Sequence, residues 1–184
     1  DDFGTLEDLQ SLIDTAHTKN IDIMMDLVIN HSSNQHPWYV EARSDMESPY
    51  RDYYYWEAPN VAYQSFVGGL VDFDPTSQAF KNEVKDILKF YGDMGILKFR
   101  IDAAKHIFDK PGLTAIDTNA GLYLLEFKAY LQTEFGDAAH IVLIQIDGTN
   151  FEDGSGSITP ARNPDVVIPI RATSNAQRII KSCV

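Results

Sequence analysis

The stretch GILKFRIDAAKHIF, residues 95–108, decides the fold of this chain. It begins with β-favouring apolar residues and ends in polar ones, which predicts a strand that reaches a polar edge. Because successive side chains point to opposite faces of a strand, its residues divide into a polar and an apolar face: Lys98, Arg100 and Asp102 against Phe99 and Ile101. Apolar residues facing outward and an Arg-x-Asp pair facing inward suit a parallel barrel strand, where the outer face packs under helices and catalytic groups lie at the carboxyl end.

The Arg-x-Asp pair is the first candidate for chemistry. Arg100 stands two residues before Asp102, on the same face, and can favour the ionised carboxylate by charge and hydrogen bonds. A nucleophilic aspartate requires that ionised form. The alternative is a structural ion pair at a strand end.

Composition sets the outer limits. The 184 residues, 44% of them hydrophobic, can form one ordinary domain with a sizeable core. A formal net charge of −12 argues against nucleic acid or an anionic membrane as a partner. Cys183 is the single cysteine, so no internal disulfide can form.

The ends of the sequence indicate a piece of a longer protein. It has no initiator Met and no signal-peptide pattern, and it starts directly before an amphipathic helix. No apolar run approaches 18 residues, so we expect no membrane-spanning segment. The sequence indicates no cellular location.

Helical and strand patterns alternate along the chain. Thr5 and Asp8 form a loose capping box before a helix that ends near residues 19–20. A buried strand over 21–30 ends in Asn30 and His31. Further elements predicted are a helix that starts with Asp74 as N-cap and Pro75 as its first residue, the strand described above, a helix over about 122–135 that stops at Gly136, and a strand over 140–146. This βαβαβ order predicts an α/β fold with parallel strands and covering helices.

Residues 32–74 predict a long loop rich in aromatic side chains. Such long connections are usually functional. Two interpretations of its aromatics remain open, stacking on sugar rings or packing into a small core of the loop itself: Trp38, Tyr39, Tyr50, Tyr53, Tyr54, Tyr55, Trp56, Tyr63 and Phe66.

Beyond residue 147 the pattern gives way to a Gly/Ser/Asp-rich stretch. We interpret 148–184 as an irregular tail that either stands alone or continues the preceding domain. Residues 166–170 are a candidate for one more short strand.

Two motifs in this order carry a family resemblance. DLVINH, residues 26–31, resembles the first characteristic region of the α-amylase family of glycoside hydrolases, and RIDAAKH, residues 100–106, resembles its second region. The lead-ins Phe3-Gly4-Thr5 and VDFDP, residues 71–75, also match. The resemblance covers residues 1–147.

The resemblance implies a fragment of a (β/α)₈ TIM barrel. Residues 1–147 would be a partial catalytic domain that holds barrel strands 3, 4 and 5, with 32–74 as the insert after strand 3. A whole barrel needs about 250 residues, so the remaining strands lie elsewhere.

The same resemblance implies roles for individual residues. Asp102 matches the nucleophile, and Arg100 matches the arginine that orients it. His31, Lys105 and His106 match substrate contacts, with buried structural imidazoles as the alternative for the two histidines. Asp26 matches a structural carboxylate at the barrel rim. Asn30 matches an asparagine that binds calcium in some members and is structural in others, so no cofactor is required and Ca²⁺ remains an open candidate.

The sequence departs from the family in three respects. A retaining mechanism needs a second, protonated carboxyl group about 5 Å from the first, and the family supplies a Glu where this chain has Gln145. An amide cannot deliver a proton. Lys98 replaces a small residue, and we expect it to snorkel or to pair, with Asp26 as the candidate partner. The family's third carboxylate is not found.

The resemblance therefore implies a retaining glycosidase that acts on α-glucan or malto-oligosaccharide substrates, although the sequence does not separate hydrolysis from transglycosylation. Gln145 and the incomplete barrel put the activity of the chain as written in doubt. The alternative is a catalytically inactive relative that serves as a sugar-binding or protein-interaction module. A third interpretation is that the sequence beyond Ile144 was altered or spliced, in which case Gln145 carries no information.

Overall fold

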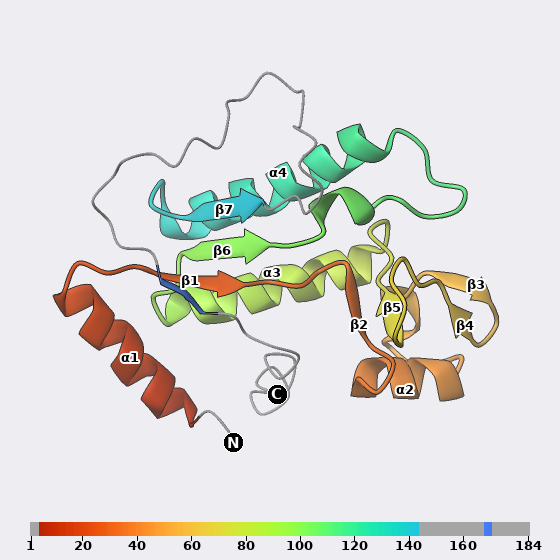
Figure 1. Cartoon of the computed structure of the whole chain (residues 1–184), viewed down its shortest axis with the longest axis horizontal. Coiled ribbons are helices and arrows are strands. Elements are labelled where there is room, and N and C mark those ends of the chain that lie inside the picture. The colour runs from red at the N-terminus through yellow and green to blue at the C-terminus, as the bar shows by residue number, and fades with distance from the viewer. Residues whose placement is uncertain (1–3, 144–167, 171–184) are drawn as a thin grey trace.

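A four-stranded parallel sheet forms the centre of the chain (Figure 1). The computed structural model describes residues 4–143 and 168–170. The strands lie in the order β7-β6-β1-β8, and each neighbouring pair is parallel: β7 (His140–Leu143), β6 (Lys98–Ile101), β1 (Ile23–Asp26) and β8 (Ile168–Ile170). The three strands predicted from the sequence, β1, β6 and β7, lie side by side in chain order, and the candidate strand near the end of the chain is confirmed as β8.

The alternation expected in the central strand is confirmed. Phe99 and Ile101 are fully buried, whereas Lys98 and Arg100 on the other face of β6 are partly exposed. Two helices, α3 (Gln78–Asp93) and α4 (Ile116–Phe135), cover one side of the sheet (Figure 1). The apolar face of β6 joins their buried residues in one hydrophobic core.

Local signals predicted the first helix correctly. Helix α1 (Leu6–Thr18) begins with the capping box, in which the Asp8 amide donates to Thr5 Oγ1 at 3.3 Å and the Thr5 amide donates to Asp8 Oδ2 at 2.8 Å. Two residues of its apolar face, Ile13 and Ala16, are buried.

The predicted start of α3 was wrong. The N-cap is Ser77, whose hydroxyl accepts from the Phe80 amide at 3.1 Å. Asp74 instead caps a preceding turn, because its Oδ1 accepts from the Thr76 amide at 2.8 Å. An aspartate followed by proline suits a turn as well as a helix start, so the local signal was ambiguous. The apolar residues at helical spacing along α3 are all buried: Phe80, Val84, Ile87, Leu88 and Tyr91.

Helix α4 begins at Ile116, earlier than the apolar periodicity suggested. Its first turn is polar and follows Ala115, which has a positive φ of 51°. The predicted stop is confirmed, since α4 ends at Phe135 and Gly136 follows with a φ of 81°, a conformation that favours glycine.

The segment between β1 and α3 is not the long loop that the sequence suggested. It folds into short elements that lie at the carboxyl ends of β1 and β6, on the right of Figure 1. Strand β2 (His31–Ser33) pairs antiparallel with β5 (Leu70–Asp72). The other elements complete this unit: α2 (Pro37–Ser44), the 3₁₀ turn η1 (Arg51–Tyr53), β3 (Trp56–Ala58) and β4 (Val61–Ala62).

Most aromatic side chains of this unit pack against one another. Tyr54 is 1% exposed, and the Tyr39 ring stacks on Trp56 with centroids 5.7 Å apart. Trp38 stacks on Tyr50 at the same centroid distance. Of the two interpretations, a small core of the segment's own therefore describes these rings. Packed aromatic rings hold this unit together, and they are not regularly spaced along the chain. The sequence pattern therefore did not indicate that the segment is folded.

Candidate active site

The candidate site lies at the carboxyl ends of β1 and β6, as expected for a parallel sheet. Asp26 is the last residue of β1 and lies directly opposite Arg100 in the parallel register. Asp102 follows the last residue of β6. The register thus places two carboxylates on either side of one guanidinium.

Arg100 binds both carboxylates. Its Nη1 donates to Asp26 Oδ1 at 2.8 Å and its Nη2 donates to Asp102 Oδ2 at 3.4 Å. Burial opposes the positive charge, but the hydrogen bond and charge of Asp26, with a further contribution from Asp102, raise the pKa of Arg100 overall. The contact between Arg100 and Asp102 expected from the sequence is present, whereas the bond to Asp26 was not foreseen.

The second oxygen of Asp102 is held by the backbone. Asp102 Oδ1 accepts from the Ala103 amide at 2.9 Å. Ala103 has a φ of 55°, and such left-handed backbone is uncommon for a residue other than glycine. Strained backbone of this kind clusters at functional sites. The carboxylate of Asp102 is therefore oriented from both sides, and its side chain is 35% exposed.

The two candidate histidines both contact one aromatic ring, that of Phe66. His31 is the first residue of β2, and its ring centroid is 5.4 Å from that of Phe66. His106 belongs to the 3₁₀ turn η2 (Ala104–His106), and its centroid is 5.1 Å from Phe66. Lys105 lies in the same turn. Phe66 was singled out only as one of many loop aromatics, and its sequence position held no sign of this contact.

Lys110 is the residue that sequence reasoning missed. Its side chain is fully buried, and Nζ donates to Asp72 Oδ2 at 2.6 Å, to the His106 carbonyl at 3.2 Å and to Asn30 Oδ1 at 3.4 Å. Burial lowers the pKa of Lys110, an effect that Asp72 opposes. A lysine followed by Pro-Gly is typical of an exposed turn, so no signal in the sequence predicted this position.

The arrangement does not fit a calcium ion at Asn30. A carboxylate, an amide oxygen and a carbonyl oxygen are the ligands that Ca²⁺ prefers, but here all three accept hydrogen bonds from the same ammonium group. A divalent cation would have to take the place of the Lys110 charge. Within residues 4–143 and 168–170, no group of three or more His, Cys, Asp or Glu side chains could hold a metal ion.

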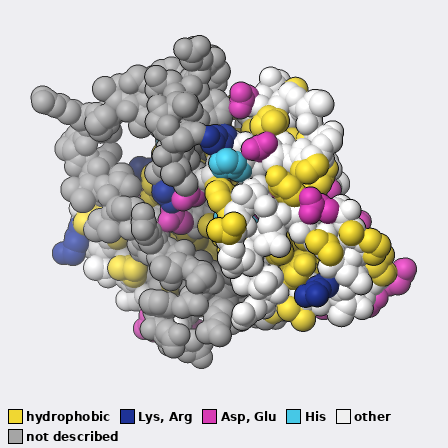
Figure 2. All heavy atoms as spheres, turned by 45° about the vertical axis from the view of Figure 1, so that its right-hand side comes forward, with side chains coloured by type: hydrophobic (Ala, Val, Ile, Leu, Met, Phe, Trp, Pro, Cys, Tyr) yellow, Lys and Arg dark blue, Asp and Glu magenta, His cyan; other side chains and the backbone are white. Residues whose placement is uncertain are grey.

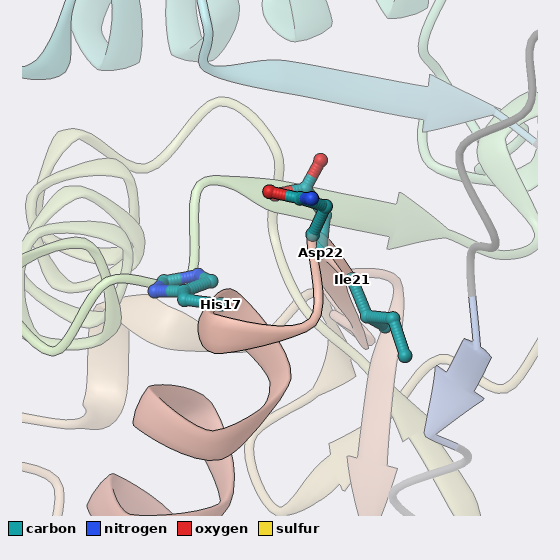
Figure 3. A pocket seen from close by; sticks show the side chains of 4 residues that line it. His17, Ile21 and Asp22 are labelled. Carbon is teal, nitrogen blue, oxygen red and sulfur yellow. The ribbon is translucent and has the colours of Figure 1, made fainter.

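Lys98 pairs with Asp22 rather than with Asp26. The distance from Lys98 Nζ to Asp22 Oδ2 is 2.5 Å. The parallel register explains this choice, because Lys98 lies opposite Met24 and Asp26 lies opposite Arg100. Asp22 also lines a shallow pocket with His17, Asn20 and Ile21 before the start of β1 (Figure 3). That pocket lies at the amino end of the strand, away from Asp102.

On the face shown in Figure 2, histidine, basic and acidic side chains lie close together. Gln145, the residue expected at the position of the general acid, lies outside the described residues. In the described part of the chain, no helix is both long and apolar enough to cross a membrane.

Comparisons with known proteins agree with these motifs. Residues 1–68 match the family model of the alpha-amylase catalytic domain. The chain is 40% identical over 145 residues to "Alpha-amylase 3" of Dictyoglomus thermophilum, a match that covers 71% of this chain and 28% of the relative. It is 34% identical over 126 residues to an oligo-1,6-glucosidase of Heyndrickxia coagulans, covering 54% of this chain and 23% of the relative.

A solved structure matches the fold. The crystal structure of an alpha-amylase from H. orenii superposes with a TM-score of 0.68 at 30% sequence identity and covers 78% of this chain and 32% of that one. The chain thus spans less than a third of the length of the curated relatives named above. Over the part of its length that these comparisons cover, the chain belongs to the α-amylase family.

Proposed function

We propose that this chain is part of the catalytic domain of a retaining glycoside hydrolase that acts on α-glucans or malto-oligosaccharides. In this proposal β1, β6 and β7 are strands 3, 4 and 5 of a (β/α)₈ barrel, and the aromatic unit between β1 and α3 is the insert after strand 3. The names of the relatives, an α-amylase and an oligo-1,6-glucosidase, support this substrate class.

One observation carries the proposal, namely the orientation of the Asp102 carboxylate at the end of β6. Arg100 and the Ala103 amide each hold one of its oxygens. Asp102 would attack the anomeric carbon of the sugar, and the bond to the leaving oxygen would break to give a glycosyl ester. Water would then hydrolyse that ester.

The other members of the site would bind and orient the sugar. His31 and His106 both contact Phe66, and Lys105 lies in the same turn as His106. Asp26 would be a structural carboxylate that accepts a hydrogen bond from Nη1 of Arg100. The proton that the leaving oxygen needs would have to come from another group, because Gln145 at the position of the acid cannot supply it.

The test uses a chimaera in which the matching segment of the Dictyoglomus thermophilum relative is replaced by this chain. Loss of general-acid assistance typically costs about 10²- to 10⁴-fold on natural substrates, whose leaving groups need a proton. An α-glucosyl fluoride needs no such proton. We therefore expect the fluoride to form an ester on Asp102, detected by intact mass, while starch is turned over slowly.

Two variants make the test decisive. Gln145→Glu should restore turnover of malto-oligosaccharides, and Asp102→Asn should abolish both reactions. If the ester forms on Asp102 but Gln145→Glu does not increase turnover of malto-oligosaccharides, position 145 is not that of the general acid.

The second candidate function is a non-catalytic sugar-binding or protein-interaction module, which Gln145 favours. Failure of both substrates in every variant of the chimaera would support this candidate and reject the first.

A further inference from the structure

A buried amide, that of Asn30, connects Lys110 to His31. Lys110 Nζ donates to Asn30 Oδ1 at 3.4 Å, and Asn30 Nδ2 lies 3.2 Å from His31 Nδ1. Asn30 and the side chain of Lys110 have no solvent exposure. Both groups are therefore removed from bulk water, and the hydrogen bonds between them restrict how each is oriented.

The ammonium group determines which way the Asn30 amide points. An ammonium group only donates hydrogen bonds, so it must face the amide oxygen and not the NH₂. Lys110 cannot move to suit a reversed amide, because Asp72 Oδ2 and the His106 carbonyl hold Nζ at 2.6 and 3.2 Å. The NH₂ of Asn30 is thus directed to His31.

The amide in turn determines the tautomer of His31. The NH₂ group is a donor, so Nδ1 of His31 must present its lone pair. In the neutral imidazole the hydrogen then resides on Nε2. Burial lowers the pKa of His31 by more than the nearby Asp72 raises it, which is consistent with the neutral form.

We propose that Lys110 is a positioning residue that, through Asn30, holds His31 as the Nε2–H tautomer, so that His31 meets a sugar oxygen as a hydrogen-bond donor. The sugar in this statement rests on the proposed function, whereas the tautomer does not. Lys110 also holds the carbonyl of His106. One buried cation therefore organises both histidines that lie beside Phe66.

The experiment measures the tautomer without any sugar. The ¹⁵N-labelled 184-residue chain is examined by long-range ¹H–¹⁵N NMR at neutral pH, and His31→Gln assigns the His31 signals. We expect Nδ1 to resonate as an unprotonated nitrogen and Nε2 as a protonated one. A protonated Nδ1, or a charged ring, overturns the proposal.

Asn30→Asp tests the middle of the relay that runs from Lys110 through Asn30 to His31. The carboxylate has no hydrogen to donate and accepts one from the ring instead, so His31 should change to the Nδ1–H or the charged form. An unchanged Nε2–H tautomer in this variant overturns the relay.

Lys110→Met tests the origin of the relay. Without the ammonium group the amide is no longer oriented, and both ring nitrogens should shift to intermediate, averaged positions. The double variant Asp72→Asn/Lys110→Met removes both buried charges. It is used for the same NMR measurement if Lys110→Met alone does not fold. Lys89→Met, which removes an exposed lysine on α3, is the matched control and should leave the His31 signals in place.

An unchanged tautomer in whichever Lys110 variant folds shows that Lys110 is not the positioning residue. This result is independent of the glycosyl-ester test, so a failure of the inference and a failure of the proposed function are distinguishable.

Discussion

The buried ion pair between Lys110 and Asp72 should dominate the response of this chain to a single substitution. Both side chains have 0% exposure, and Nζ lies 2.6 Å from Oδ2. Lys110→Met keeps most of the side-chain volume but leaves Asp72 as a buried, uncompensated charge. Breaking a buried pair in this way costs about 3–5 kcal/mol.

The remaining contacts of Asp72 place the cost at the lower end of that range. Asp72 keeps two hydrogen bonds, from the Ser65 amide at 3.0 Å and from Ser65 Oγ at 2.5 Å. We expect Lys110→Met to lower the free energy of unfolding by about 3 kcal/mol. For a domain of this size, that loss corresponds to a fall in Tm of about 6–12 °C.

The double variant provides the comparison. Replacing both charged partners of a buried pair is often close to neutral, so Asp72→Asn/Lys110→Met should be more stable than Lys110→Met alone by about 2 kcal/mol. Urea unfolding measures each free energy, and an unchanged m-value shows that the unfolding transition itself is unaltered. Lys89→Met serves as control, because an exposed i,i+4 pair contributes only about 0.3–0.5 kcal/mol.

Two results would refute this reasoning. A loss below about 1 kcal/mol for Lys110→Met would mean that the ammonium group is not balancing a buried charge. A double variant as unstable as the sum of its two single variants would mean that Lys110 and Asp72 act independently.

Three further predictions test the core, a helix cap and a titrating group. Phe99→Ala should lower the free energy of unfolding by about 3–5 kcal/mol, because it empties the fully buried face of β6; urea unfolding measures this, and a loss under 1 kcal/mol would place Phe99 outside the core. Ser77→Ala should cost about 1 kcal/mol by removing the N-cap of α3, measured the same way; no loss would contradict Ser77 as the cap. The pKa of His31 is lowered in the folded chain, mainly by burial, so the unfolded chain takes up the proton first as pH falls below about 6.5, and folding stability decreases. His31→Gln should reduce this decrease below about pH 6.5 in a pH series of melts, and an unchanged slope would show that His31 is not the group responsible.

Local patterns in the sequence were sufficient for the presence of the long helices and of the strands of the parallel sheet, and for one half of the site. The alternation of residues in β6 predicted which face is buried and that Arg100 and Asp102 point the same way. The capping box of α1 and the stop of α4 at Gly136 were equally readable. Each of these features depends on residues within a few positions of one another, so the sequence contains all of the interacting groups.

Pairings between distant residues depended on the tertiary structure. The register of β1 against β6 brings Asp26 to Arg100 and leaves Lys98 to Asp22, 76 residues away. The packing of the aromatic unit brings Phe66 into contact with two histidines that the sequence separates by 75 positions.

The burial of Lys110 is the clearest example of a feature that only the tertiary structure decided. Its partners come from three separate parts of the chain, Asn30 after β1, Asp72 at the end of β5 and the carbonyl of His106 in η2. A lysine can be buried only where acceptors from several segments converge on its ammonium group. The sequence therefore determined which face of β6 is buried and which carboxylate lies beside Arg100, whereas long-range packing decided which cation binds the buried carboxylate Asp72, because that packing alone removes the charge from water and supplies its partners.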